Sequence, residues 1–350
     1  MTRAGVGQLT IIDRDYVEES NLQRQQLFSE ADMKQKMPKA VAAKQRLSEV
    51  NSHVKIDAIV GDAEIDILRE IVPETDLIID ATDNFETRLL LNDIAQKYQK
   101  PWIYGAVVAS YGVTFTVLPD KTPCLQCLQE YIPANGATCD SVGIIQPVVQ
   151  KVVSQQITEA LKLLTGNEAA LSGKLISFDL WKNEHTEMEA EALRKPDCPS
   201  CSSKRSYPNL AYDSRLKTAV LCGRNTVQLR PQRKQTDLDE VAKELKKNKQ
   251  IKLFENPYLL SFEVDSFRIV LFQDGRTLVH GTMDSIEAKK IFITAIWGES
   301  TKIRRYWCFL EKKAIFYSVL IIIASCLYRG DFFSSIIMKT VCGLNKKIYL

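Results

Sequence analysis

Hydrophobic and polar positions in the first part of the chain follow two alternating patterns. Short apolar runs bounded by polar residues are typical of buried strands, and they alternate with segments whose apolar residues recur every three to four positions, as in helices. The predicted strands are 9–13, 54–60, 76–81 and 101–107, and the predicted helices are 40–50 and 84–98. Strands joined by helices form right-handed crossovers, so we expect a doubly wound α/β domain with ligands at the carboxyl ends of its strands.

The pattern changes after residue 107. Tyr111–Leu118 alternates apolar and polar residues with period two directly after a strand, which indicates an antiparallel neighbour and a mixed sheet. A long helix at 143–164 and a strand at 174–181 complete this Rossmann-like domain. The polar segment 202–215 is typical of a linker, and the residues beyond it predict strands around one charged helix, 238–247.

Three regions are therefore expected. The first is an α/β domain at 1–207, the second a small α+β unit at 208–298, and the third a hydrophobic tail at 299–350. The tail contains the apolar run Ala314–Tyr328, which is shorter than the roughly 20 apolar residues that a membrane helix needs. We expect a poorly structured tail, with a buried helix or strand as the alternative, and do not expect membrane contact.

Composition and charge narrow the class of protein. The chain has 350 residues, of which 45% are hydrophobic and 25% charged, as in ordinary globular proteins. Its formal net charge of +3 is too small to indicate a nucleic-acid partner or an anionic membrane surface. Nine cysteines without an N-terminal secretory signal fit a reducing compartment, so the sequence indicates a cytoplasmic protein.

Four of the cysteines form two Cys-x-x-Cys pairs, Cys124 with Cys127 and Cys198 with Cys201. Each such turn presents two sulfurs to one ion, and two turns complete the tetrahedral thiolate shell that structural Zn²⁺ prefers. The pairs therefore predict a structural zinc site. The alternative is two unrelated pairs or one redox pair, as in thioredoxin-like proteins. The cysteines expected to be packing residues are those at 222, 308, 326 and 342.

Two acidic residues at predicted strand ends are candidates for nucleotide binding. Asp13 ends the first strand, where a carboxylate can accept hydrogen bonds from ribose hydroxyls. A glycine-rich loop normally precedes that position by about 20 residues, but only twelve residues precede Asp13 and they contain no Gly-x-Gly-x-x-Gly run. Asp83 follows the strand 76–81, where it could hold Mg²⁺ against phosphate oxygens. The alternatives are an ordinary strand-end carboxylate for Asp13 and a helix N-cap for Asp83.

Two cations and one thiol complete the candidate chemistry. Arg24 and Lys39 suit a triphosphate, the first through its bidentate fork and the second as a point charge, although solvated surface residues are the alternative. Cys139 lies in a loop of small residues before the helix 143–164. A helix N-terminus favours the thiolate, so Cys139 is a candidate nucleophile or sulfur acceptor, with a structural cysteine as the alternative.

Taken together, these residues resemble the ThiF/MoeB/HesA family of adenylyltransferases, relatives of ubiquitin-activating enzymes, and ThiF-type members in particular. The motifs that carry the resemblance are Asp13-Arg-Asp15, Ser20-Asn-Leu-Gln-Arg-Gln25, Pro38-Lys39, Asp80-Ala-Thr-Asp-Asn84, Thr138-Cys139 and the two cysteine pairs. The resemblance covers about residues 1–298. It implies an enzyme that uses ATP to adenylylate the C-terminal glycine of a ubiquitin-like sulfur-carrier protein in thiamine or molybdopterin biosynthesis.

The resemblance also implies roles for individual residues. Those expected to bind the nucleotide are Asp13 at the ribose, Asn21, Arg24 and Lys39 at the phosphates, and Asp83 at magnesium. Cys139 corresponds to a cysteine that forms a covalent link to the carrier in some members, so Arg24, Asp83 and Cys139 are the expected catalytic residues. The expected cofactors are ATP, Mg²⁺ and Zn²⁺. Relatives work as homodimers, and a homodimer is expected here.

Two features depart from the family pattern. The glycine-rich loop and an arginine that precedes it have no counterpart, so we expect an N-terminally truncated chain with an open sheet edge where the first strand would lie. The tail at 299–350 resembles nothing in the family. An alternative function is therefore an inactive remnant that folds around zinc and binds a carrier protein or dimerises. A nicotinamide-dependent dehydrogenase would share the fold, but would not explain Arg24 and Lys39 beside four cysteines.

Overall fold

The computed structural model describes residues 1–132, 142–211, 219–221, 225–229, 236–248 and 251–297. The described residues from Met1 to Phe292 belong to one compact unit. Several predicted features lie outside the described residues, namely Cys139, the cysteines at 222, 308, 326 and 342, and the apolar run 314–328. No helix of the described ranges is long and apolar enough to cross a membrane. The predicted region boundaries at 207 and 298 stay a prediction.

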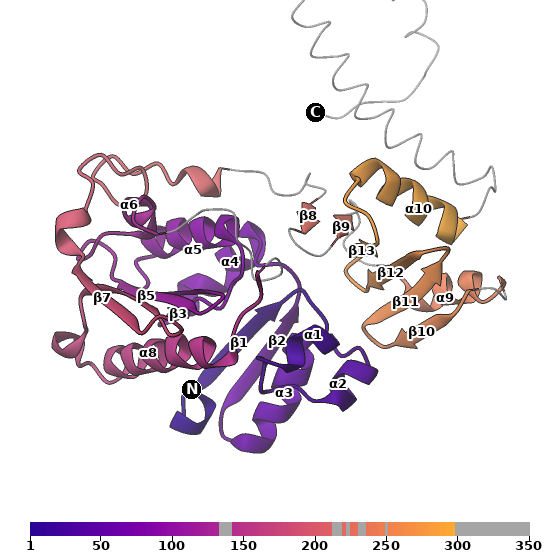
Figure 1. Cartoon of the computed structure of the whole chain (residues 1–350), viewed down its shortest axis with the longest axis horizontal. Coiled ribbons are helices and arrows are strands. Elements are labelled where there is room, and N and C mark those ends of the chain that lie inside the picture. Colours follow the sequence, from indigo (N-terminus) through magenta and orange to yellow (C-terminus); the bar gives the residue numbers. More distant parts are fainter. Residues whose placement is uncertain (133–141, 212–218, 222–224, 230–235, 249–250, 298–350) are drawn as a thin grey trace, which may run out of the picture. The chain divides into compact units, whose positions relative to one another are not determined.

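The first two strands form a small parallel sheet. β1 (Gln8–Asp13) pairs in register with β2 (Lys55–Val60), from Gln8 opposite Lys55 to Asp13 opposite Val60. The helices that connect them are α1 (Glu19–Leu22), α2 (Glu30–Lys34) and α3 (Lys39–Val50). Figure 1 shows these helices on one side of the strand pair. The observed bounds agree with the predicted strands 9–13 and 54–60 to within one residue.

A second sheet contains five strands in the order β3-β4-β5-β6-β7. The strands are β3 (Ile78–Ile79), β4 (Trp102–Val108), β5 (Tyr111–Val117), β6 (Lys174–Asp179) and β7 (Glu184–Glu189). β3 and β4 are parallel, whereas every later pair is antiparallel. The predicted antiparallel strand after residue 107 and the mixed character of the sheet are thus confirmed.

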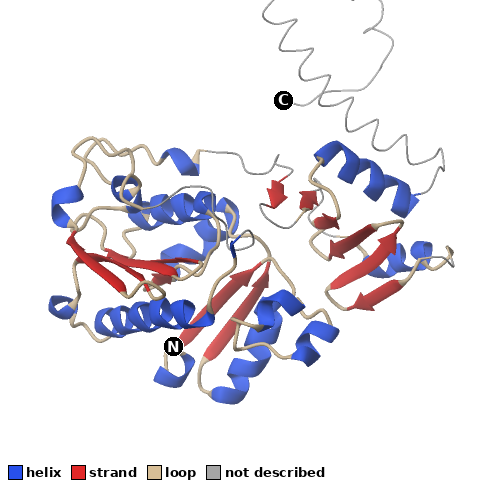
Figure 2. Ribbon diagram, viewed as in Figure 1, coloured by secondary structure: helices blue, strands red, loops and turns tan. Residues whose placement is uncertain are grey.

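Helices cover both faces of this sheet (Figures 1 and 2). Those of the sheet domain are α4 (Ile65–Ile71), α5 (Phe85–Lys97), α6 (Leu125–Leu128) and α8 (Gln146–Leu164). On one face, Ile94 of α5 packs in the main core with Trp102 and Phe115. On the other, Val152 of α8 packs with Phe178. Short 3₁₀ helices are Thr2–Ala4, Val72–Glu74, Glu168–Ala170, Glu191–Leu193 and Pro208–Leu210.

The one doubly wound sheet that the pattern predicts is divided in the structure. Among the described residues, β1 hydrogen-bonds only to β2 and β3 only to β4, so each has one open edge. The predicted strand 76–81 is also shortened to Ile78–Ile79. Its shortening has a local cause, because the side chain of Asp80 accepts a hydrogen bond from the backbone N–H of Thr82 and turns the chain (2.8 Å).

Close helix packing on this sheet depends on glycine. A Cβ at Gly105 of β4 would collide with Gln156 and Val152 of α8, and a Cβ at Gly112 of β5 would collide with Val152 and with Phe178. The two glycines therefore let the backbone of the sheet approach the helix that covers it.

The C-terminal part of the unit Met1–Phe292 is a six-stranded antiparallel sheet in the order β10-β11-β12-β13-β9-β8. Its strands are β8 (Ala219–Leu221), β9 (Thr226–Leu229), β10 (Leu253–Asn256), β11 (Leu259–Val264), β12 (Phe267–Phe272) and β13 (Thr277–His280). Its helices are α9 (Leu238–Leu245) and α10 (Ser285–Trp297). The predicted α+β character and the charged helix are confirmed.

Candidate functional site

Asp13 lies at the carboxyl end of β1, as predicted. Its Oδ1 accepts a hydrogen bond from the backbone N–H of Asp15 (2.8 Å), which turns the chain away from the strand. Burial raises the pKa of Asp13, the positive charge of Lys39 opposes this shift, and the negative charge of Asp15 adds to it. The site is therefore a crowded group of charges in which one cation offsets two neighbouring carboxylates.

Lys39 is the first residue of α3 and is almost fully buried, with 5% of its surface exposed. Its backbone N–H donates to the carbonyl of Asp15 (2.9 Å), and its Nζ forms an ion pair with Asp15 Oδ2 (3.1 Å). A short bridge between Tyr16 and Pro38 brings the two segments together. A buried lysine requires a charged partner, and Asp15 supplies it beside Asp13.

Asp83 lies in the loop between β3 and α5 and is exposed. Its negative charge raises the pKa values of both Asp13 and Arg14, so the ends of β1 and β3 lie within electrostatic range of each other. The alternative role of Asp83 as a helix N-cap is wrong. The cap of α5 is Asn84, whose side chain accepts a hydrogen bond from the backbone N–H of Thr87 (2.8 Å).

A buried ion pair supports the loop that carries Asp83. Arg88 Nε contacts Asp80 Oδ2 (3.1 Å), and the same guanidinium donates to the carbonyls of Thr82 and Gly105. Burial raises the pKa of the Asp80 carboxyl group, and the charge of Arg88 opposes that shift. Sequence reasoning gave these two residues no role. The sequence did contain a signal for this pair, because an acidic residue ends an apolar strand and an arginine lies in the helix that follows.

A second unpredicted pair joins the carboxyl ends of β1 and β2. Arg14 Nη1 contacts Asp62 Oδ1 (3.1 Å). Although burial lowers the pKa of Arg14, the carboxylates of Asp62 and Asp15 together raise it above its ordinary value. Arg14 is therefore a second fixed positive charge beside Asp13.

The other predicted phosphate-binding residues lie in or next to α1. Asn21 is buried, and its Oδ1 accepts a hydrogen bond from the backbone N–H of Glu18 (3.2 Å) as part of a reciprocal helix cap. Arg24 Nη1 donates to the carbonyl of Ser20 (2.9 Å). The backbone N–H of Arg24 donates to the carbonyl of Asn21 (3.1 Å), whereas in the described part of the chain no hydrogen bond or ion pair joins its guanidinium to Asp13 or Lys39.

The two cysteine pairs meet in space. The four sulfur atoms lie within 4.8 Å of one another, with Cys124 Sγ 3.6 Å from Cys198 Sγ and Cys127 Sγ 3.5 Å from Cys201 Sγ. All four side chains are almost completely buried. Four thiolates at about 2.3 Å around one tetrahedral ion would be separated by about 3.8 Å, so the observed spacing suits such an ion.

The pKa of Cys127 is lowered, chiefly because its sulfur accepts a hydrogen bond from Cys124, whose own pKa is raised as the donor. The backbone N–H of Lys195 also donates to Cys127 Sγ (3.4 Å). These contacts favour a thiolate at Cys127, which is the form that binds a metal ion. Of the described residues, no other three or more His, Cys, Asp or Glu side chains gather closely enough to share one metal ion.

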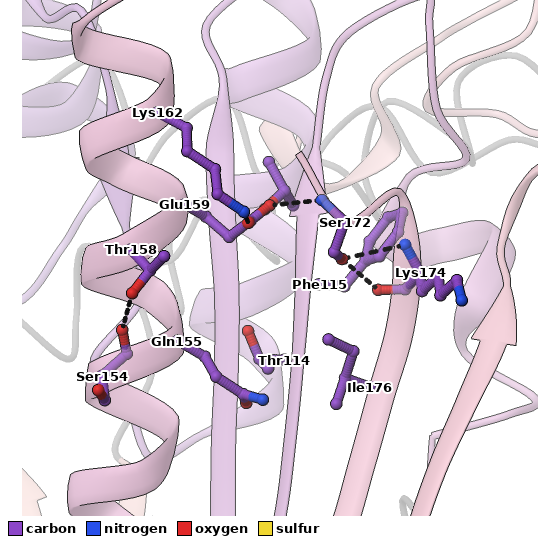
Figure 3. Close-up of a pocket in the computed structure, with 11 residues that line it drawn as sticks. Thr114, Phe115, Ser154, Gln155, Thr158, Glu159, Lys162, Ser172, Lys174 and Ile176 are labelled. Atoms are coloured by element: carbon purple, nitrogen blue, oxygen red, sulfur yellow. Dashed lines mark hydrogen bonds and ion pairs between the residues drawn. The ribbon is translucent and has the colours of Figure 1, made fainter. Parts of the chain in front are cut away.

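A cavity of about 240 Å³ lies between α8 and strands β5 and β6, away from these charges (Figure 3). Its most buried ionisable group, Glu159, accepts hydrogen bonds from Thr116 Oγ1 (3.1 Å) and the backbone N–H of Ser172 (3.2 Å), and pairs with Lys162 Nζ (2.6 Å). The carboxylate of Glu159 is therefore satisfied by its neighbours. The cavity contains none of the predicted site residues, and we assign it no function.

Comparison with known proteins gives the family. A model of the ThiF family matches residues 1–200. The sulfur carrier protein ThiS adenylyltransferase of Bacillus subtilis (strain 168) is 51% identical over 293 residues, which are 83% of this chain and 86% of that protein. The chain belongs to the ThiF family. The molybdopterin-synthase adenylyltransferase of Escherichia coli (strain K12) is 36% identical over 205 residues, which are 57% of this chain and 80% of that protein.

Solved structures support the fold of this ThiF-family chain. A crystal structure of E. coli MccB with succinimide matches with a TM-score of 0.50 and 22% identity. The match covers 58% of this chain and 61% of that one, so the chain spans less than two thirds of that structure. At this identity the likeness concerns the fold alone.

Proposed function

We propose that the protein uses ATP to adenylylate the C-terminal carboxylate of a ubiquitin-like sulfur-carrier protein. The observation that carries the proposal is the group of charges at the carboxyl ends of β1 and β3, where Lys39 and Arg14 lie beside Asp13, Asp15 and Asp83. Ligands of open α/β sheets bind at such strand ends. The relative from B. subtilis, which is named for this activity with ThiS, supports the same assignment.

In the proposed reaction a carboxylate oxygen of the carrier attacks the α-phosphorus of ATP. The bond from that phosphorus to the bridging oxygen breaks, and pyrophosphate leaves with the electron pair. No proton transfer to the attacking carboxylate is needed, so catalysis is a matter of positioning and charge stabilisation. Mg²⁺, when bound, would neutralise phosphate charge.

Each predicted residue has a place in this proposal. Asp13 would accept hydrogen bonds from the ribose, and Asp83, exposed beside it, would bind the magnesium ion. The residues that would bind the phosphates are Lys39, Arg24 and Asn21. The Lys39 ammonium is paired with the Asp15 carboxylate at 3.1 Å. A phosphate oxygen would therefore compete with that carboxylate for the ammonium. The role of Cys139 stays a prediction.

We also propose that the four cysteines bind Zn²⁺ in a structural role. Four thiolates fill a tetrahedral shell and leave no position for substrate, which distinguishes a structural from a catalytic zinc site. The ion would join α6 to the segment 198–201, about which the sequence alone predicts no regular structure. A homodimer is proposed as well, on the resemblance to the family.

The decisive experiment is ATP–pyrophosphate exchange with a ubiquitin-like carrier, measured with this chain and with a version extended by a family-like N-terminal segment. Carrier-dependent exchange is expected in at least one of them. A carrier without its C-terminal glycine is the control and should support no exchange. Absence of exchange from both versions would refute the proposal. It would favour the alternative of an inactive protein that folds around zinc and binds a carrier.

A further inference from the structure

The ThiF family match ends at residue 200, whereas the antiparallel sheet β8–β13 begins at Ala219. Two buried side chains of this sheet nevertheless reach the segment that carries Asp13, within the same compact unit Met1–Phe292. Both act on Arg14, the residue that follows Asp13.

The first is Arg276, just before β13, with 5% of its surface exposed. Its Nη1 donates a hydrogen bond to the backbone carbonyl of Arg14 (3.0 Å). Its Nε pairs with Asp274, and its guanidinium lies 4.6 Å from the centre of the Phe272 ring. An arginine held on two sides presents its Nη1 donor in a fixed direction.

The second is Gln228 of β9, which is fully buried. Its Nε2 donates to Asp62 Oδ2 (3.0 Å), while the other oxygen of that carboxylate, Oδ1, accepts from Arg14 Nη1 (3.1 Å). The amide therefore fixes the carboxylate that in turn fixes the guanidinium. One contact from the C-terminal sheet holds the main chain of Arg14, and the other holds its side chain through Asp62.

Arg14 matters because of the charges around it. The carboxylates of Asp62, Asp15 and Asp83 all raise its pKa, so its guanidinium lies within electrostatic range of each. Asp13 and Asp83 are the residues proposed to bind ribose and magnesium. A movement of this cation would change the potential that a triphosphate meets.

We propose that Arg276 and Gln228 of the C-terminal sheet are positioning residues of the nucleotide site, which hold Arg14 in place beside the carboxylates that receive Mg²⁺-ATP. The inference rests on the proposed function. It gives the C-terminal sheet a role in nucleotide binding. If the sheet only packed against the first 40 residues, loss of any contact between them would have the same effect on nucleotide binding.

Arg268 of β12 supplies a matched control. Its Nη2 contacts Glu18 Oε1 (2.8 Å), so it also joins the C-terminal sheet to the N-terminal segment, but through a carboxylate other than Asp62. The variant Q228L removes the hydrogen bond to Asp62, and R276M removes the hydrogen bond to the Arg14 carbonyl together with the pair to Asp274. R268M removes an ion pair, and all three variants keep most of the side-chain volume.

The test is the KM for Mg²⁺-ATP in carrier-dependent exchange. R276M and Q228L are each expected to raise KM about 10-fold, the effect of one hydrogen bond to or near a charged group, with a much smaller change in kcat. R276K, which keeps a donor, should recover part of the loss. R268M should change KM much less than either of these variants does. An equal rise in KM in R268M, or none in R276M and Q228L, would overturn the proposal.

A second readout keeps this inference separate from the proposed function. The proposed function would be refuted if the wild-type chain showed no ATP–pyrophosphate exchange, either with or without the N-terminal extension. Amide hydrogen exchange at residues 13–15 needs no nucleotide. It therefore tests whether Arg276 holds the Arg14 segment in place even if the protein has no adenylylating activity. Faster exchange there in R276M than in R268M supports it, and equal exchange in the two variants overturns it.

Discussion

Replacing Arg88 with methionine tests whether the loop that carries Asp83 depends on a buried charge. The substitution keeps the aliphatic stem but removes the ion pair with Asp80 (3.1 Å) and the hydrogen bonds to the carbonyls of Thr82 and Gly105. The side chain of Asp80 is fully buried, so in the variant its carboxylate would lie in a site with little solvent and no cation. Removing one partner of a buried pair costs about 3–5 kcal/mol.

The lower half of that range is expected, because Asp80 keeps two hydrogen bonds. Its Oδ1 still accepts from the backbone N–H and the hydroxyl of Thr82, both at 2.8 Å. We therefore expect the free energy of unfolding to fall by about 3 kcal/mol in R88M. The double variant D80N/R88M should be more stable than R88M, because the substituted amide carries no charge to bury.

The cost should also depend on pH. Burial already raises the pKa of Asp80, and loss of Arg88 removes the charge that opposes this shift. A carboxyl group whose pKa is higher in the folded than in the unfolded state binds protons preferentially in the folded state, so stability rises as pH falls through the folded-state value. The deficit of R88M relative to wild type should therefore shrink as the pH falls toward the ordinary pKa of an aspartate carboxyl group.

Denaturant unfolding of both proteins at several pH values, followed by circular dichroism, measures the deficit. R69M is the matched control, since Arg69 is exposed and makes one long hydrogen bond to the carbonyl of Leu210 (3.5 Å). Its stability should remain within about 0.5 kcal/mol of wild type. A deficit in R88M below about 1 kcal/mol, or one that does not change with pH, would refute the reasoning.

Three further predictions follow from described contacts. Cys198→Ser should lower bound zinc and stability together, and stoichiometric zinc by atomic absorption in that variant would contradict the four-cysteine site. Gly105→Ala should destabilise the protein by about 1–3 kcal/mol in thermal unfolding, whereas Gly61→Ala, where a Cβ would meet its nearest neighbour at 3.9 Å, should have little effect. Arg24→Ala and Asp83→Ala should each slow carrier-dependent exchange about 10²- to 10³-fold, and unchanged turnover in either would remove that residue from the proposed mechanism.

The local elements were predictable because their causes are local. Apolar periodicity and nearby caps place α5 at Phe85–Lys97, with Asn84 as its cap, inside the predicted helix 84–98. The division of the sheet was not predictable in this way. Hydrophobic alternation reports that a segment is a strand, whereas its neighbours depend on pairings between residues far apart in sequence.

The candidate site shows the same contrast. Strand ends drew attention to Asp13 and Asp83, but their partners were not visible, because Arg14 pairs with Asp62 across 48 residues of sequence. The cysteine pairs meet across 74 residues and were predicted nonetheless. Two Cys-x-x-Cys turns have few chemical uses other than binding one metal ion. The residue types alone therefore indicated that the two turns meet in space. A single arginine such as Arg88 can have many kinds of partner, so its residue type does not indicate which one it contacts.

Among the described residues, β1 and β3 each have one edge without a strand neighbour, which would affect the behaviour of the protein in concentrated solution. Hydrogen-bonding groups along an unpaired strand can pair with a strand of another chain, and β1, Gln8–Asp13, has no proline or lysine to discourage this. Such pairing requires an encounter between two molecules. Its rate therefore increases with the square of the protein concentration, so diluting a stored sample would slow this association.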